Sequence, residues 1–452
     1  MKELDHFEKE KLISKKQEFE EIISKSQEST KPDLPKHREY LLVVVLLFSQ
    51  FVAQCTDTFL FPFFPYKAKN KGLNEIDIGI VFSSFELARF VTAPVLGYLL
   101  SWISPKNSCI LATSILTITC VAFGAASFAP GYSFYFLSVS IRIVAGSATA
   151  VLTVSLMTIL FKCSSLHTST VVGLVEMLQG GGYAAGPALG SALRRVGGYT
   201  FIFWTMGCFI GLSCLAQVLV IPTTKHDCQK KSEGLSSLHI MKIPGMFVLI
   251  LHCLAYNIVG SSRASGASNF LNSTFGLGIS DIGLLFSLWA VLYLLACPLM
   301  SKLVSKGYIY SLMITTWFLS ILLNLFCGPS QLLNFLFHDQ KFIQLPLVLI
   351  SVSNFLQPAM YIPPFQAAIN LAIVNGHEKD SIQTYGMVTG LLNGGLGLGA
   401  MVGPIMSGAV TDAADFTWVL TILAGIGTAM FILMSVYLIW MKMTGKPLKP
   451  GK

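Results

Sequence analysis

The chain repeats its own architecture, because the pattern Gly-Leu-x-x-x-Asp-Ile-Gly at positions 72–79 recurs at positions 276–283. The match continues at the same offset of 204 residues through the apolar segments that follow. A second pair of glycine-rich segments, at 173–187 and 390–404, repeats at an offset of 217. Apolar segments repeated in this way indicate a chain built from two related halves.

The composition places the chain in the membrane, because 53% of its 452 residues are hydrophobic and only 12% are charged. The charged fraction is about half of that in a soluble protein. Apolar runs of about 20 residues can cross the hydrocarbon core. Twelve such runs occur, at 41–63, 78–103, 108–128, 133–161, 168–193, 199–221, 244–267, 282–304, 308–328, 345–373, 384–411 and 416–440. We therefore expect an all-α membrane protein, with twelve transmembrane helices in two pseudo-symmetric six-helix bundles.

The distribution of Lys and Arg predicts the orientation, because these residues concentrate on the cytosolic side of membrane proteins. Outside the spans they gather in the N-terminal tail, the central linker and the C-terminal tail, which we expect to be cytosolic. Three lysines, at 67, 69 and 71, oppose this assignment, and the glycosylation sequon at 272–274 is expected in an external loop. The expected units are a tail (1–39), a bundle (40–221), a linker (222–243), a second bundle (244–441) and a tail (442–452).

Several classes of function are excluded by what the sequence lacks. The net charge of +8 comes without a basic cluster large enough to follow a nucleic-acid backbone, so no nucleic-acid partner is expected. The ten cysteines are scattered and show no metal-ligand spacing. The sequence also contains no nucleophile elbow and no phosphate-binding loop. We expect neither an enzyme nor a bound metal or cofactor.

Ionisable residues inside the spans need an explanation, because each costs at least about 2.5 kcal/mol to insert. The first half contains Asp57, Glu86, Arg89, Arg142 and Glu176, whereas the spans of the second half include Arg263 and His252 and contain no acid. All three acids therefore lie in the first half, and the second half offers neutral polar and aromatic groups.

Glu176 is the strongest candidate for a binding residue. Helical spacing places Gln179 and Tyr183 on the same face, so that a carboxylate, an amide and an aromatic ring adjoin one another. Such a face suits an organic cation, because the ring adds a cation–π contact to the charge of the carboxylate. The carboxyl group could also exchange a proton for that cation. The alternatives are a hydrogen bond to a Ser or Tyr hydroxyl of another helix and a structural pair with Arg142.

The remaining ionisable residues allow both functional and structural interpretations. Glu86 and Arg89 lie one helical turn apart and can neutralise each other. Asp57 can accept a proton near the outer mouth, or it can cap an unwound helix end. Arg142 can hold an acid in its charged form and relay proton release, or it can be purely structural. Arg263 is expected to extend to the outer membrane interface, and His252 to be a packing residue.

The repeated glycine and proline residues predict packing and hinge positions. Glycines leave one side of a helix without side chains, so that a second helix can approach closely. Proline removes a backbone hydrogen bond and bends the helix. These residues are Gly182, Gly186 and Pro187 in span 5 and Gly403 and Pro404 in span 11.

Several of these motifs resemble a known family. The twelve spans, Arg142-x-x-x-Gly146 and the segment Gly182–Gly190 resemble the major facilitator superfamily, and the last of these is similar to its antiporter motif. Four shorter motifs are similar to the vesicular polyamine transporter branch of the vesicular amine transporters: Pro62-Phe63-Phe64-Pro65, Phe85-Glu86-Leu87, Leu174-Val175-Glu176 and Asn375-Gly376-His377-Glu378. The resemblance implies a proton-coupled exchanger that loads polyamines, and also monoamines, into acidic vesicles.

Two departures from the family pattern bear on this interpretation. Ser101 and Ser305 stand where the loop motifs of the two halves would have an acid, which puts the corresponding gate contact in doubt. Monoamine and acetylcholine carriers of the family also use acids in the second half, and this sequence has none there, which favours polyamines or mixed cations. Candidate contacts from the second half are Tyr256, Asn257, Trp289, Gln357 and Tyr361.

The sequence leaves two other functions open. One is a plasma-membrane exporter of drugs or solutes with the same fold, and the other is a membrane receptor or scaffold that no longer transports. An internal acidic or secretory vesicle is favoured as the location, because Glu8, Leu12 and Ile13 have the spacing of an acidic dileucine signal for a sorting adaptor. The expected partners are thus a small organic cation, protons, the lipid bilayer and this adaptor.

Overall fold

The computed structural model describes most of the chain between residues 35 and 443. The described ranges are 35–60, 64–73, 75–100, 103–222, 238–277, 279–327, 344–378 and 381–443. Within these ranges every regular element is a helix. The residues of the dileucine pattern and most of the central linker lie outside the described residues.

The described helices divide between the two halves of the chain. The first half contains α2 (Lys36–Thr58), α3 (Phe64–Lys69), α4 (Glu75–Leu99), α5 (Pro105–Ala126), α6 (Gly131–Cys163) and α7 (Thr168–Val220). The second half contains α8 (Leu238–Lys242), α9 (Pro244–Phe275), α10 (Ile279–Ser305), α11 (Ile309–Cys327), α13 (Gln344–Leu356), α14 (Pro358–Val374), α15 (Ile382–Ala413) and α16 (Phe416–Met443).

These helices account for the twelve predicted spans. Eleven segments of the described residues are long and apolar enough to cross a membrane. Helix α7 has 53 residues, about 80 Å of helix at 1.5 Å per residue, whereas one crossing needs about 30 Å. Its backbone leaves the helical conformation at Gly198, where φ is 76°, so α7 comprises spans 5 and 6. Helices α13 and α14 together form span 10.

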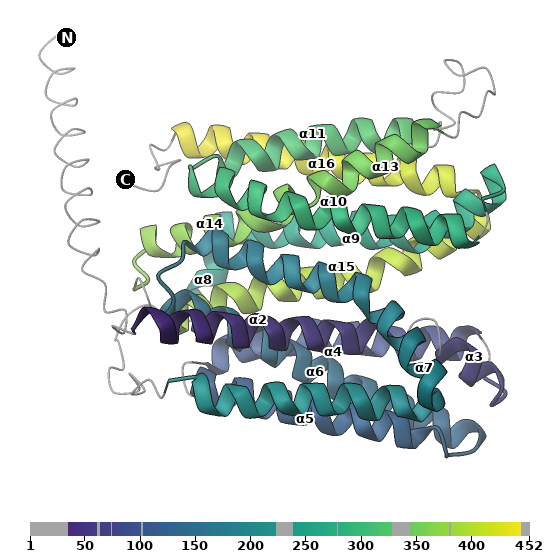
Figure 1. The fold of residues 1–452 in the computed structure, drawn as a ribbon. Coiled ribbons are helices and arrows are strands. Elements are labelled where there is room, and N and C mark those ends of the chain that lie inside the picture. Colours follow the sequence, from purple (N-terminus) through teal and green to yellow (C-terminus); the bar gives the residue numbers. More distant parts are fainter. Residues whose placement is uncertain are drawn as a thin grey trace, which may run out of the picture.

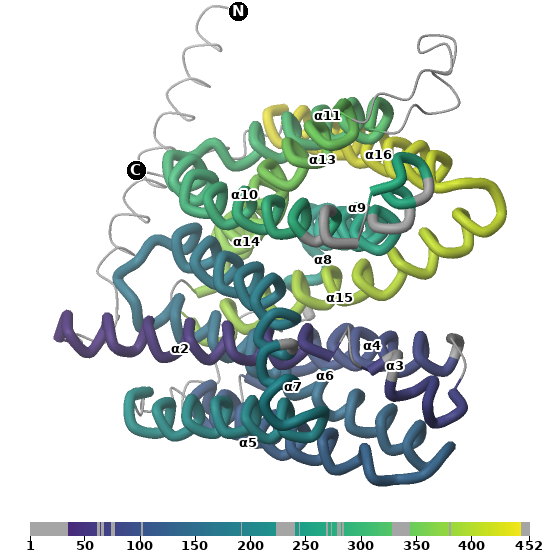
Figure 2. The backbone as a smooth tube through the Cα atoms, turned by 45° about the vertical axis from the view of Figure 1, so that its right-hand side comes forward, coloured from purple at the N-terminus to yellow at the C-terminus, as the bar shows by residue number. Residues whose placement is uncertain are grey.

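The two halves form two bundles that lie against each other. In Figures 1 and 2 the helices of the first half group together below those of the second half. Within the bundles, α7 packs on α2 and α15 packs on α9. Between the bundles, α4 packs on α15 and α7 packs on α10. The predicted pair of six-helix bundles is confirmed.

Equivalent glycines make equivalent contacts in the two bundles. The hydroxyl of Thr58 on α2 donates to the carbonyl oxygen of Gly182 at 3.2 Å. The hydroxyl of Ser261 on α9 donates to the carbonyl oxygen of Gly399 at 3.3 Å. Gly182 and Gly399 are related by the offset of 217. The sequence repeat is therefore also a repeat of helix packing, in which glycines let α7 approach α2 and α15 approach α9.

The next glycines on these helices have the same surroundings. Gly186 faces the hydroxyl of Thr58 and the backbone of α2. Gly403 faces the hydroxyl of Ser261 and the backbone of α9. Pro187 and Pro404 follow directly and lie inside the helices α7 and α15. Their hinge role stays a prediction, because one conformation shows packing and not motion.

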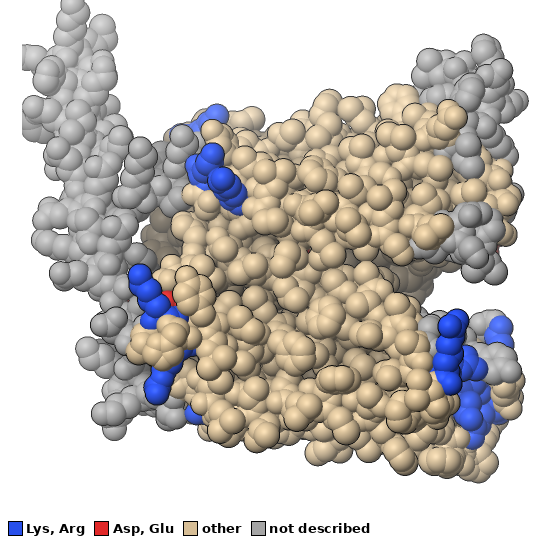
Figure 3. All heavy atoms as spheres, viewed as in Figure 1, with Lys and Arg blue, Asp and Glu red and all other residues tan. Residues whose placement is uncertain are grey.

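The bundles are closed on one side of the membrane and apart on the other. At the side where α2 begins, which the sequence predicts to be cytosolic, a Cβ atom on Gly97 would lie 2.6 Å from the carbonyl oxygen of Gly386. Near the same side, a Cβ on Gly173 would lie 2.9 Å from the Cβ of Ser301. Figure 3 shows the molecule hollowed between the bundles at the opposite side. The structure therefore has the central space open away from the N-terminal side.

Several predicted segment ends require correction. The first span was expected to reach residue 63, but α2 ends at Thr58. The span predicted at 244–267 matches the apolar segment Gly245–Ala267, and helix α9 continues beyond this span to Phe275 and stops at Gly276, whose φ is 67°. The sequon at 272–274 therefore lies in the last helical turn and not in a loop. The helix continues past the end of its apolar segment, because polar residues outside the hydrocarbon do not by themselves end a helix.

Three lysines, at 67, 69 and 71, lie on and beside the short helix α3. Lys71 donates to the carbonyl oxygen of Ala129, and its ammonium group lies 5.4 Å from the centre of the Phe134 ring. Lys67 lies 5.6 Å from the centre of the Tyr199 ring. These contacts tie the entry of α4 to the neighbouring loop and helices. They give the lysines a local structural role, which is compatible with the predicted orientation.

Candidate functional site

Two of the intramembrane charges form a buried ion pair. Nη1 of Arg142 on α6 lies 2.8 Å from Oδ1 of Asp57 on α2. The guanidinium group of Arg142 also lies over the ring of Phe85, 3.9 Å from its centre. Both charged side chains are more than nine-tenths buried. Arg142 therefore pairs with Asp57, which is the arrangement that its predicted role of holding an acid in its charged form requires, and its role as a proton relay stays a prediction.

Glu86 and Arg89 form a second pair within α4. The guanidinium group lies 3.3 Å from the Glu86 carboxylate, and both side chains are about one-fifth exposed. Arg89 is also within electrostatic range of Asp57, Glu176 and Tyr361. This pair therefore borders the space between the bundles and lies beside the buried pair.

Glu176 is the one acid of the three that has no ion pair among the described residues. Its Oε1 accepts a hydrogen bond from the hydroxyl of Tyr293 on α10, so the contact joins the two bundles. Its Oε2 is buried and has no hydrogen-bond partner in the described part of the chain. Tyr256 and Tyr361 lie within electrostatic range of the same carboxyl group. Of the structural alternatives for Glu176, the tyrosine hydrogen bond is present and the pair with Arg142 is absent.

The other two residues predicted on this face of α7 are Gln179 and Tyr183. Nε2 of Gln179 is buried and has no partner among the described residues. The side chain of Tyr183 is 53% exposed and lies within electrostatic range of Asp57 and Glu86. The helix thus presents a carboxylate, an amide and an aromatic side chain next to the charged residues of α2 and α4.

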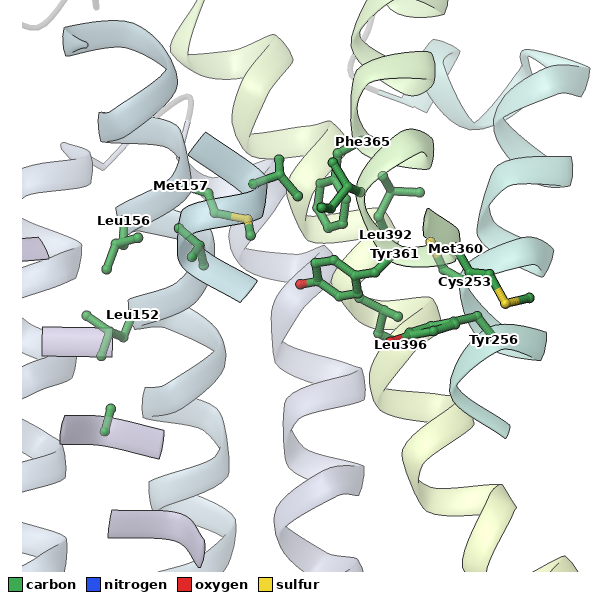
Figure 4. Close-up of a cluster of buried hydrophobic side chains, with 14 of the residues drawn as sticks. Leu152, Leu156, Met157, Cys253, Tyr256, Met360, Tyr361, Phe365, Leu392 and Leu396 are labelled. Carbon is green, nitrogen blue, oxygen red and sulfur yellow. The ribbon is translucent and has the colours of Figure 1, made fainter. Parts of the chain in front are cut away.

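The five predicted contacts from the second half divide into two groups. Tyr256 and Tyr361 pack together with ring centres 5.9 Å apart and face Glu176. Figure 4 shows the hydroxyl of Tyr361 pointing toward the first-half helices. Trp289 instead donates to the Ser351 hydroxyl at 3.0 Å, and Asn257 donates to the carbonyl of Leu396 at 2.6 Å. Gln357 lines a separate cavity. These last three lie outside the Glu176 cluster.

Tyr293 is the residue that sequence analysis left out of the site. It aligns with Arg89 at the repeat offset of 204, so the repeat places both residues at equivalent positions of spans 2 and 8. Both side chains lie at the interface between the bundles. The alignment with a charged residue was the signal that could have identified Tyr293.

Two residues of α9 are buried within the second bundle. Arg263 is only 6% exposed and donates to the hydroxyl of Ser353, so the expectation that it extends to the membrane interface was wrong. His252 accepts from Nε1 of Trp317 at 3.0 Å, and its Nε2 lies 2.8 Å from the carbonyl oxygen of Met360. His252 is thus a packing residue with both nitrogens satisfied.

Throughout the described ranges, no cluster of His, Cys, Asp and Glu could hold a metal ion.

The sequence profile of the Major Facilitator Superfamily matches residues 46–376, which is well over half of the chain. The chain belongs to this superfamily. The arrangement of its helices in two bundles around a central space is thus the fold of a transporter of this superfamily. The chain is a multi-pass membrane transporter and not an enzyme.

Three mammalian members of the superfamily are similar along most of their length. Two proteins named "MFS-type transporter SLC18B1" are each 29% identical, over 397 residues in Rattus norvegicus and 417 in Mus musculus. The alignments cover 84% and 88% of this chain and 83% and 87% of the relatives. The protein of the same name from Homo sapiens is 25% identical over 389 residues, which is 82% of each chain. These relatives confirm the resemblance that the short motifs indicated.

A solved structure also resembles this fold. It is described as the "Crystal structure of the human organic anion transporter MFSD10 (TETRAN)" and aligns with a TM-score of 0.67. The alignment covers 88% of this chain and 99% of the solved chain, with 15% sequence identity. At that identity the similarity concerns the fold alone.

Proposed function

We propose that this transporter is a proton-coupled antiporter that moves organic cations, in particular polyamines such as spermine and spermidine, into acidic vesicles. The observation that carries the proposal is Glu176, a buried carboxyl group at the interface of the bundles that has no ion pair among the described residues. Because Asp57 pairs with Arg142 and Glu86 pairs with Arg89, Glu176 leaves this central region with an excess of negative charge.

The aromatic residues around Glu176 favour an organic cation over an inorganic one. Tyr293, Tyr256 and Tyr361 supply three rings from the second bundle, and the rings can make cation–π contacts with an ammonium group. Glu86 and Asp57 lie on other helices near the same space. An extended cation with several ammonium groups can pair with Glu176 through one of them while the others lie near these paired acids, which fits a polyamine better than a compact cation.

Proton coupling follows from competition at the same carboxyl group. A proton that enters from an acidic lumen neutralises Glu176, so the cation loses its counter-charge and leaves into the vesicle. Deprotonation on the cytosolic side restores the binding site. The bundles rock about the site between these states, and the hydrogen bond between Tyr293 and Glu176 links their positions to the state of the carboxyl group.

The relatives bear on the substrate in different ways. The similarity to proteins named "MFS-type transporter SLC18B1" supports a transporter of that type. The structural relative is named an organic anion transporter, and it shares only 15% of aligned residues with this chain. An organic anion is therefore the rival substrate class that an experiment must include.

The proposal is tested by uptake of radiolabelled spermidine into proteoliposomes with an acidic interior. Glu176→Gln is expected to abolish proton-driven uptake, because it removes the charge and retains the shape of the side chain. Asp412→Asn is the matched control, since Asp412 is an exposed acid at the end of α15. Tyr293→Phe keeps the ring and removes the hydrogen bond, and it is expected to alter the pH dependence of uptake.

The same vesicles distinguish the classes of substrate. Spermine and monoamines are expected to compete for uptake, whereas carboxylate-bearing organic anions are not. Near-normal, pH-dependent uptake by Glu176→Gln would show that Glu176 is structural. Saturable uptake of an organic anion without any response to spermine would refute the cation proposal.

A further inference from the structure

Arg263 is a buried cation that the described structure leaves without a counter-charge. It lies on α9 inside the second bundle and is 6% exposed. Its hydrogen bond goes to the neutral hydroxyl of Ser353, and its electrostatic neighbours are Tyr256 and Cys327. The predicted spans of the second half contain no Asp or Glu. A carboxylate of its own bundle therefore cannot neutralise this guanidinium group within the membrane.

The side chain of Arg263 lines a cavity with polar walls. The cavity lies between α9, α11, α13 and α14, and its polar lining residues are Tyr256, Thr316, Ser320, Ser353 and Gln357. These residues supply four hydroxyl groups and an amide. The hydroxyl of Thr316 already donates to the carbonyl oxygen of Leu312 at 2.6 Å, so the donors that remain for a ligand are those of the other four residues. The space holds on the order of one water-sized particle, which is too small for a polyamine or another organic substrate.

The combination of an isolated cation and converging donors points to an anion. A guanidinium group has five N–H donors, and the hydroxyl of Ser353 accepts from only one nitrogen of Arg263. Leaving a charge unpaired in a low-dielectric interior costs several kcal/mol, which a bound counter-ion offsets. Because Gly260 adds no side chain to the cavity wall, the space beside Arg263 stays open.

We propose that this cavity is a binding site for a small monovalent anion, with chloride as the ion that fits the space. Arg263 provides the charge, and the hydroxyls of Ser353 and Ser320 donate to the anion. The site is separate from the proposed cation site, but Tyr256 connects the two, because it lines the cavity and is within electrostatic range of Glu176. Anion binding is thus placed where it can influence the transport site.

The test is a binding measurement that does not depend on transport. The full-length protein in detergent is unfolded thermally while sodium gluconate is replaced by sodium chloride at constant ionic strength. Gluconate is the reference because it is too large for the cavity. We expect chloride to raise the melting temperature in a saturable way. Arg263→Gln is expected to increase the half-saturating chloride concentration at least about ten-fold, equivalent to about 1.4 kcal/mol, the scale of a hydrogen bond to a charged group.

Two further variants keep the test decisive if Arg263→Gln does not fold. Ser353→Ala retains the charge and is expected to raise the half-saturating concentration by a smaller factor. Arg195→Gln is the control, because Arg195 is exposed on α7 outside the cavity, and it is expected to leave the chloride response unchanged.

The outcomes separate the possible contents of the cavity. A response to acetate that depends on Arg263 would also support an anion site and would assign it to a carboxylate group. A melting temperature that does not respond to chloride or acetate would mean that the cavity holds only water, and the proposal would be wrong. A chloride response of equal size in Ser353→Ala and wild type would likewise overturn it, whatever the outcome of the spermidine uptake experiments.

Discussion

Replacing Gly390 by alanine should open the side of the transporter that is closed in this structure. A Cβ atom at this position would lie 2.6 Å from the carbonyl oxygen of Ala93 and 3.0 Å from the Cα atom of Gly97. Both neighbours are backbone atoms of α4, so no side chain can rotate away to make room. Helices α4 and α15 must therefore separate by about 0.8 Å before the oxygen reaches an ordinary contact distance of 3.4 Å.

The size of the effect follows from the cost of overpacking. An extra carbon atom in a well-packed interface costs about 1–3 kcal/mol. Here the cost falls only on the conformation in which α4 and α15 are in contact, because the methyl group is free once the bundles separate at this side. The population of the closed conformation relative to the open one should fall by a factor of about 5 to 150.

The population can be measured as a distance between spin labels at Tyr40 and Tyr308. These side chains are 71% and 55% exposed, and they lie in different bundles near the N-terminal side of the molecule. The measurement uses a background in which three cysteines, Cys208, Cys214 and Cys228, are replaced by serine. Gly390→Ala is expected to increase the fraction of long distances in protein reconstituted without substrate.

A matched control is available on the outer surface of the second bundle. A Cβ atom on Gly425 of α16 would have no neighbour within 4 Å, so Gly425→Ala adds the same methyl group without a clash. Its distance distribution should equal that of the wild type. If Gly390→Ala also gives the wild-type distribution, the contact between α4 and α15 does not hold the closed side together, and the argument from packing fails.

Two other predictions concern the buried ion pair and the N-terminal tail. Arg142→Gln should lower the free energy of unfolding by about 3–5 kcal/mol, because it leaves Asp57 charged and unpaired in the interior. Adding Asp57→Asn should recover part of that loss in thermal unfolding, and no recovery would show that the two charges are not coupled. Leu12→Ala with Ile13→Ala should move a tagged protein from internal acidic compartments toward the cell surface while uptake in reconstituted vesicles stays normal. An unchanged distribution in imaging would remove the dileucine pattern as a sorting signal.

The sequence by itself determined the number of spans, the division into two bundles and the helix faces that pack closely. These features could be predicted because insertion into a bilayer depends on local properties, namely the length and hydropathy of each segment. The glycine repeat added information on packing, since a residue without a side chain reports a close approach wherever it recurs. Helix ends such as Thr58 and Phe275 were predicted less well, because hydropathy follows the edge of the hydrocarbon and not the end of the helix.

Only the tertiary structure decided which charged groups meet. Arg142 pairs with Asp57, 85 residues away, and Tyr293 binds Glu176 across 117 residues and two bundles. Arg263 lies in the interior of its bundle although its sequence position allowed it to reach the membrane interface. These outcomes depend on how each helix is rotated about its axis and how the bundles are placed, and rotation is set by the packing of all neighbouring helices together. The sequence of one helix alone therefore does not determine which residues of other helices its side chains will contact.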